Sequence, residues 1–76
     1  MEKNRIKDVL NKTLGDKLIY CEEYQDKFFL YKEIHNELPE ISESNIYSAI
    51  DQINSLFKSP LTGKKFIDVF VERLIN

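Results

Sequence analysis

The fold of this chain depends most on residues 16–38, which read DKLIYCEEYQDKFFLYKEIHNEL. Apolar and aromatic side chains recur there at helical spacing, and they fall on one arc when each residue is turned by about 100°. They are Tyr20, Cys21, Tyr24, Phe28, Tyr31, Ile34, His35 and Leu38. The opposite arc is mostly charged. The pattern predicts one long helix from Asp16 to Leu38, which ends before Pro39.

The same stretch has a second interpretation as a short β-hairpin. Aromatic and β-branched residues concentrate in 18–22 and 28–31, and these two segments could pair as strands. The hairpin would give an α+β domain with strands within residues 18–31 and a winged-helix-like arrangement. We favour the helix, because periodicity is a better guide than residue propensity, and the hairpin remains the alternative.

Two further amphipathic segments lie near the ends of the chain. The first predicts a helix over Lys3–Leu14, followed by Gly15 as a left-handed C-terminal stop and by Asp16 as the cap of the next helix. The last segment predicts a helix from about Thr62, after a break at residues 59–63. Its apolar stripe contains Phe66, Ile67, Phe70, Val71, Leu74 and Ile75.

The segment after Pro39 carries the clearest helix start signal. Ser42 is a good N-cap, and Ile41 and Ile46 have the spacing of a hydrophobic staple. The apolar stripe continues through Ile46, Ala49, Ile50, Ile53, Leu56 and Phe57 to about Lys58. With the other segments, the sequence predicts an all-α fold, a small four-helix bundle-like single domain over residues 1–76.

The composition excludes several classes of protein. The chain has 76 residues, of which 42% are hydrophobic and 32% charged, and its longest apolar runs fall far short of the roughly 18 residues that cross a bilayer. Residues 1–8 lack the apolar segment and cleavage site of a signal peptide. Cys21 is the only cysteine, so no disulfide can form within the chain. We therefore expect a cytoplasmic protein without membrane contact.

Residues for catalysis or metal binding are scarce. Cys21 and His35 could form a nucleophile and base, but on one helix 14 residues span about 21 Å. Glu22, Glu23 and Asp26 lack the His or Cys companions of a metal site, and they suit the water-facing side of a helix. We expect no enzyme activity, no metal and no cofactor.

The turn between the two middle helices resembles a helix-turn-helix, which gives one function hypothesis. The candidate DNA contacts are Ser44, Tyr47, Ser48, Gln52, Lys58, Lys64 and Lys65. The outward face of the third helix has no Lys or Arg, and Glu37, Glu40 and Glu43 flank its approach. Phosphate neutralisation supplies most non-specific affinity, so we regard nucleic acid as the less favoured partner. The basic residues of the first helix and of 58–65 could form one patch if the fold brought them together.

Three apolar residues do not fit the helical pattern of 16–38. Ile19, Phe29 and Leu30 fall on the charged arc, and exposed groups of this size mark either a second packing layer or a binding surface. Burial of both faces of a central helix is therefore the alternative to a partner site. The candidate partner contacts are Ile19, Tyr20, Tyr24, Phe29, Leu30, Glu33 and Glu37.

These features predict a small protein-binding domain. It would act as a regulator, an inhibitor or an immunity-type factor by blocking or bridging a surface of a partner protein, or it would form a homo-oligomer. The alternative is a helix-turn-helix transcriptional regulator that binds DNA as a dimer.

Overall fold

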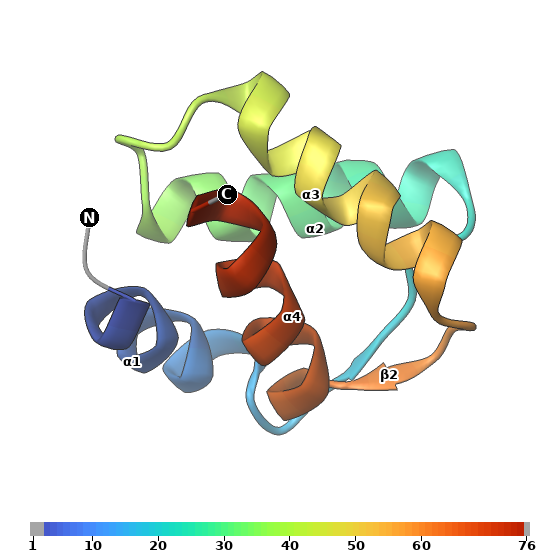
Figure 1. Cartoon of the computed structure of the whole chain (residues 1–76), viewed down its shortest axis with the longest axis horizontal. Coiled ribbons are helices and arrows are strands. Elements are labelled where there is room, and N and C mark those ends of the chain that lie inside the picture. The colour runs from blue at the N-terminus through green and yellow to red at the C-terminus, as the bar shows by residue number, and fades with distance from the viewer. Residues whose placement is uncertain (1–2, 76) are drawn as a thin grey trace.

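The computed structural model describes residues 3–75, and the side chains among them as far as Leu74. Four helices pack around one core, and two short strands form an antiparallel pair beside them (Figure 1). The helices are α1 (Lys3–Leu14), α2 (Tyr24–Glu37), α3 (Glu43–Leu56) and α4 (Gly63–Ile75), and the strands are β1 (Leu18–Ile19) and β2 (Leu61–Thr62). The predicted all-α, bundle-like fold class is confirmed. The side chain of Ile75, predicted on the last apolar stripe, lies outside the described part.

The core is centred on α4 rather than on the segment 16–38. Helix α4 packs against both α1 and α3, and α2 packs mainly on α3 (Figure 1). Phe66, Phe70 and Val71 of α4 are fully buried. They meet the buried stripe of α1, which contains Ile6, Leu10 and Leu14, and the buried stripe of α3, which contains Ile46, Ala49, Ile50 and Ile53. Each stripe has the helical spacing seen in the sequence.

The long helix predicted over 16–38 is wrong in its first third. Helix α2 begins only at Tyr24, and Leu18–Ile19 is extended and pairs with Leu61–Thr62. The backbone bonds of this stretch lead to distant residues: the Lys17 carbonyl accepts from the Gly63 N–H at 2.8 Å, and the Cys21 N–H donates to Ser59 Oγ at 3.1 Å. Pairing with a distant segment overrides the local helical pattern.

The alternative hairpin within residues 18–31 is also wrong. Residues 28–31 are helical, and the strand partner of 18–19 is 61–62. In the described residues β2 leads directly into α4, so no strand-turn-strand wing follows the third helix. The strand pair therefore ties the segment before α2 to the segment before α4.

The predicted stop after the first helix has a different geometry. Gly15 does not adopt a positive φ; its N–H donates to the Asn11 carbonyl at 3.1 Å, as in a continued right-handed turn. Lys17 then closes the turn with a 3.0 Å bond to the Leu14 carbonyl. Asp16 lies in this turn and does not cap α2, whose N-cap position is Glu23, without a side-chain hydrogen bond.

The predicted N-cap of α3 is confirmed, and α4 has a similar cap that the sequence analysis did not assign. Ser42 Oγ accepts from the Asn45 N–H at 3.3 Å, and Thr62 Oγ1 accepts from the Lys65 N–H at 3.2 Å. Helix α3 ends at Leu56, two residues before the predicted end. Leu56 was expected on the buried stripe, but it is 54% exposed. Leu56 therefore turns away from the core, whereas Ile53 is buried and Phe57 packs against the core.

Candidate functional site

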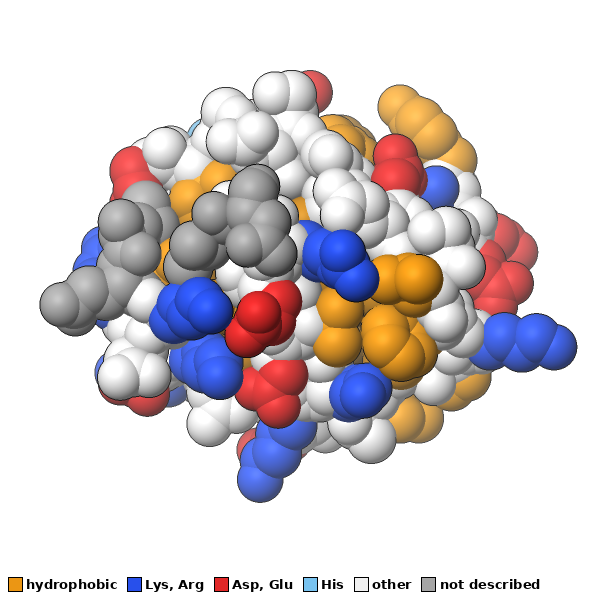
Figure 2. All heavy atoms as spheres, in the orientation of Figure 1, with side chains coloured by type: hydrophobic (Ala, Val, Ile, Leu, Met, Phe, Trp, Pro, Cys, Tyr) orange, Lys and Arg blue, Asp and Glu red, His pale blue; other side chains and the backbone are white. Residues whose placement is uncertain are grey.

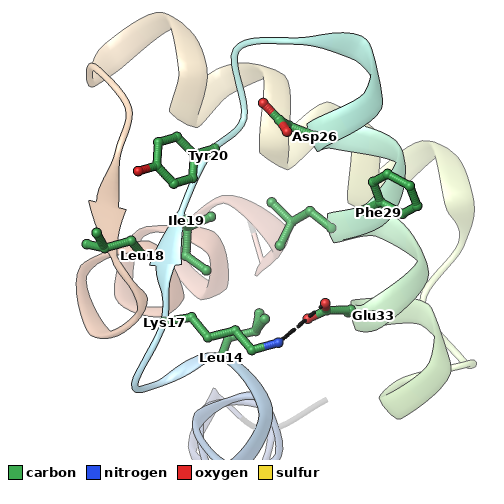
Figure 3. Close-up of a pocket in the computed structure, with 9 residues that line it drawn as sticks. Leu14, Lys17, Leu18, Ile19, Tyr20, Asp26, Phe29 and Glu33 are labelled. Carbon is green, nitrogen blue, oxygen red and sulfur yellow. Dashed lines mark hydrogen bonds and ion pairs between the residues drawn. The ribbon is translucent and has the colours of Figure 1, made fainter.

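A groove of about 160 Å³ lies between β1 and the first half of α2. Figure 3 shows the strand on one side of it and the helix on the other. We term it the β1–α2 groove. It is lined by Leu14, Lys17, Leu18, Ile19, Tyr20, Asp26, Phe29, Leu30 and Glu33.

The β1–α2 groove has an apolar floor. Leu14, Ile19 and Leu30 form this floor, and each is buried. Ile19 is held there because it lies on the strand, while Leu30 lies one helical turn before the fully buried Ile34. The floor belongs to the hydrophobic core, so its shape is fixed by packing.

The margin of the β1–α2 groove carries large apolar side chains in contact with solvent. Leu18, Tyr20 and Phe29 are 59%, 52% and 61% exposed. At one end, Lys17 Nζ lies 3.4 Å from Glu33 Oε2 and joins strand to helix, whereas Asp26 and Tyr20 lie toward the other end (Figure 3). The groove thus combines exposed apolar groups with a few charged groups at its ends, as protein-binding surfaces do.

Five of the seven candidate partner contacts line this groove: Ile19, Tyr20, Phe29, Leu30 and Glu33. The sequence left open whether Ile19 and Leu30 are exposed, and both are buried. Ile19 is 4% exposed because it is a strand residue turned to the core, and Leu30 is 6% exposed because α2 packs against both α1 and α3. For Leu30, the alternative of a helix that buries two faces is correct.

The other two candidate contacts do not line the groove. Tyr24 is 80% exposed at the start of α2. Glu37 lies at the other end of that helix, where Thr13 Oγ1 donates to its carboxylate at 3.4 Å. The sequence interpretation did not include Leu18, which also lines the groove. The sequence feature that could have indicated it is the apolar run 18–21, which lies just before the start of α2.

The candidate DNA contacts on α3 are only partly available. Ser44, Ser48 and Gln52 are exposed, with Gln52 Nε2 donating to Ser48 Oγ at 3.3 Å. Tyr47 is half-buried and stacks on Tyr31, ring centroids 5.0 Å apart, and its burial raises the pKa of the phenol. Tyr47 thus packs α3 onto α2.

The two sets of basic residues converge only in part. Lys7 and Lys64 do converge on one cavity, but Asp8 and Asp68 line the same cavity, and Lys7 Nζ lies 3.4 Å from Asp68 Oδ1. Figure 2 shows acidic and basic side chains interspersed on the face over α1 and α4. Carboxylates beside the lysines weaken the attraction for phosphate.

Other cations of the candidate patch are engaged with neighbouring groups. Arg5 donates to Glu40 at 2.8 Å, and the pKa of Glu40 is lowered by a hydrogen bond from its own backbone N–H and by this arginine. Lys65 Nζ lies 4.9 Å from the ring centroid of Phe57. Lys58 is exposed just beyond α3, beside Glu22 in a shallow cavity. These positions do not give α3 a row of cations along its outward face.

Cys21 and His35, the candidate nucleophile and base, each contact a neighbouring side chain. Cys21 is buried, and its Sγ lies 3.5 Å from Ser59 Oγ. His35 is half-buried, and its ring stacks on that of Tyr31 with the two centroids 5.3 Å apart. Within the described residues, no group of three or more His, Cys, Asp or Glu side chains could hold a metal ion.

The helices of residues 3–75 are all too short or too polar to cross a bilayer. The longest, α2 and α3, have 14 residues each, and each includes charged side chains. Comparison of the chain with models of protein families, with curated proteins and with solved structures gives no match.

Proposed function

We propose that this protein acts in the cytoplasm by binding a partner protein at the β1–α2 groove, as a regulator, inhibitor or immunity-type factor that blocks or bridges a surface of that partner. The observation that carries this proposal is the exposure of Leu18, Tyr20 and Phe29 around one apolar-floored groove. Scattered exposed apolar residues are ordinary, but here three large ones line the same groove.

The side chains at the groove are suited to protein recognition. Tyr20 and Phe29 are aromatic, and aromatic side chains are enriched at interfaces because they bury much area with few rotatable bonds. Burial of apolar surface contributes about 25 cal/mol per Å². The Lys17–Glu33 pair and Asp26 supply a polar rim that can fix the orientation of a partner.

The test compares two aspartate variants of exposed apolar residues. Phe29→Asp places a charge on the groove, and Leu56→Asp places one on α3, outside the groove, at a residue of similar exposure. We expect affinity capture from the native cell to retain the partner with the wild type and with Leu56→Asp and to lose it with Phe29→Asp. With the purified partner, we expect Phe29→Asp to raise the Kd by about tenfold or more.

Circular dichroism of both variants provides the control for folding. Equal helical content in Phe29→Asp and the wild type assigns the lost binding to the groove surface. Retention of the same partners by Phe29→Asp would contradict the proposal. A molecular mass in solution of twice that of the chain, lost in Phe29→Asp, would identify the partner as a second copy.

The alternative, a dimeric helix-turn-helix regulator, is favoured by the exposed polar stripe of Ser44, Ser48 and Gln52 on α3. It predicts sequence-specific DNA binding that weakens steeply as salt is added. Under our proposal, a fluorescence assay with the full chain finds no such binding at low salt. Salt-dependent binding that Gln52→Ala removes would instead support the regulator.

A further inference from the structure

The outer edge of β1 faces the β1–α2 groove. The two-stranded sheet pairs only one edge of β1, and both the Lys17 carbonyl and the Cys21 N–H point toward the β2 side, where Gly63 and Ser59 are their partners. Backbone groups of successive strand residues point to alternate sides in an antiparallel pair. The N–H and C=O groups of Leu18 and Tyr20 therefore point away from β2, toward α2.

We propose that the groove accepts an extended, basic peptide segment of the partner as a third strand alongside β1. This inference rests on the proposed function, because it specifies how the partner occupies the same surface. The backbone of Leu18 and Tyr20 offers main-chain hydrogen bonds to the added strand. Alternate side chains of the peptide then lie on the apolar floor formed by Leu14, Ile19 and Leu30. Strand addition to an open sheet edge is a recurrent mode of peptide recognition.

The charges at the groove select a basic peptide. Asp26 lines the groove at the end that holds Tyr20 (Figure 3). Among the ion pairs of residues 3–75, none involves Asp26, whereas the lysine of the groove, Lys17, is paired with Glu33. Lysine or arginine on the added strand would lie near this unneutralised carboxylate.

A second copy of this chain is the other occupant that could pair with the edge. The cation that its own β1 would bring is Lys17, which is already paired with Glu33 of its own chain. A partner segment with unpaired lysine or arginine offers Asp26 a stronger attraction, and we therefore assign the edge to another protein.

The first test removes one backbone donor from the edge. Leu18→Pro eliminates the N–H that points into the groove, and it leaves the hydrogen bonds to the β2 side in place, as proline permits on an edge strand. Leu18→Ala is the matched control, because it removes the side chain and keeps the N–H. We expect Leu18→Pro to lower affinity for the captured partner at least tenfold more than Leu18→Ala does. Equal affinities of the two variants would overturn the inference.

A peptide probe tests the edge without the partner and without a substitution. The isotope-labelled full chain is titrated with acetyl-Lys-Val-Lys-Val-Lys-Val-Lys-amide, and the amide resonances of Leu18 and Tyr20 are followed. We expect saturable shifts and slower hydrogen exchange at these two amides, and no such effect from the peptide with Glu in place of Lys. N-methylation of alternate peptide residues should abolish binding in one register and spare it in the other, because only one edge of a strand faces β1.

The outcomes separate this inference from the proposed function. Suppose that Leu18→Pro binds the partner as Leu18→Ala does, that the probe leaves Leu18 and Tyr20 unshifted, and that Phe29→Asp still loses the partner. Strand addition is then wrong, and the groove remains the binding surface. Retention of the partner by Phe29→Asp would instead remove the surface itself. Self-association that Leu18→Pro abolishes would assign the edge to a second copy and overturn the basic-peptide assignment.

Discussion

Leu30→Asp is expected to unfold the domain, although Phe29→Asp, one residue earlier, leaves it folded. Leu30 is 6% exposed, whereas Phe29 is 61% exposed. Truncation of a buried leucine to alanine costs about 2–5 kcal/mol, and burial of an unpaired carboxylate adds to that cost. A chain of 76 residues has a total stability of only about 4–11 kcal/mol. Far-UV circular dichroism and urea unfolding of the two variants measure the difference.

The conservative variant Leu30→Met is the control for this experiment. It keeps an apolar side chain of similar volume, so its cost should remain below about 1.5 kcal/mol. A Leu30→Asp protein with the helical content and urea midpoint of the wild type would place Leu30 in solvent, where the helical pattern of 16–38 puts it. In that case the β1–α2 groove would lack part of its floor.

The parts of the fold that have local signals could be predicted from the sequence. The start of α3 at Ser42 and that of α4 at Thr62 each depend on one side-chain oxygen and an N–H three residues ahead. The buried stripes of α1, α3 and α4 follow from helical periodicity. Such signals act within one or two turns, so a single sequence contains them in full.

The strand β1 could not be predicted in the same way. Tyr20, Cys21 and Tyr24 continue the helical spacing of α2 back through residues 16–23, so the periodicity gives no sign of the break. The break is stabilised by Leu61–Thr62, which lie more than forty residues later in the chain. A two-residue strand also leaves too short a pattern of alternation to recognise.

The sequence pattern indicated three residues of the groove, but for two of them the reason it suggested was wrong. Apolar residues among charges marked Ile19, Phe29 and Leu30, and all three do line the groove. Only Phe29 has the exposure that this pattern implied, because Ile19 and Leu30 pack inward. Leu18 escaped notice because its exposure depends on the direction of β1, which only the pairing with β2 fixes.

Gly63→Ala is expected to destabilise the fold strongly, even though alanine favours helices. Gly63 begins α4, and a Cβ there would overlap the backbone carbonyl of Leu14 at the end of α1. The gain in helix propensity is about 1 kcal/mol, whereas forcing atoms into a packed site costs about 1–3 kcal/mol, and more where the obstacle is backbone. We expect the cost of the overlap to exceed the gain in propensity. The Gly63 N–H donates to the Lys17 carbonyl at 2.8 Å, and the two segments cannot move apart without losing that hydrogen bond.

Urea unfolding of Gly63→Ala should therefore show a free energy of unfolding that is lower than that of the wild type by about 2 kcal/mol or more. The control is Gln25→Ala, at an exposed position of α2, which should stay within about 0.5 kcal/mol of the wild type. A partly unfolded sample would not allow peptide binding to the edge of β1 to be measured. Hydrogen exchange at the Ile19 amide is therefore the better local measurement. If Gly63→Ala accelerates exchange at Ile19 relative to the wild type, and by a larger factor than at Ile50 of α3, the contact between Gly63 and the turn after α1 holds β1 in place. A stable Gly63→Ala protein would mean that the end of α1 lies farther from α4, and β1 would then lose the neighbour that fixes the direction of its free edge.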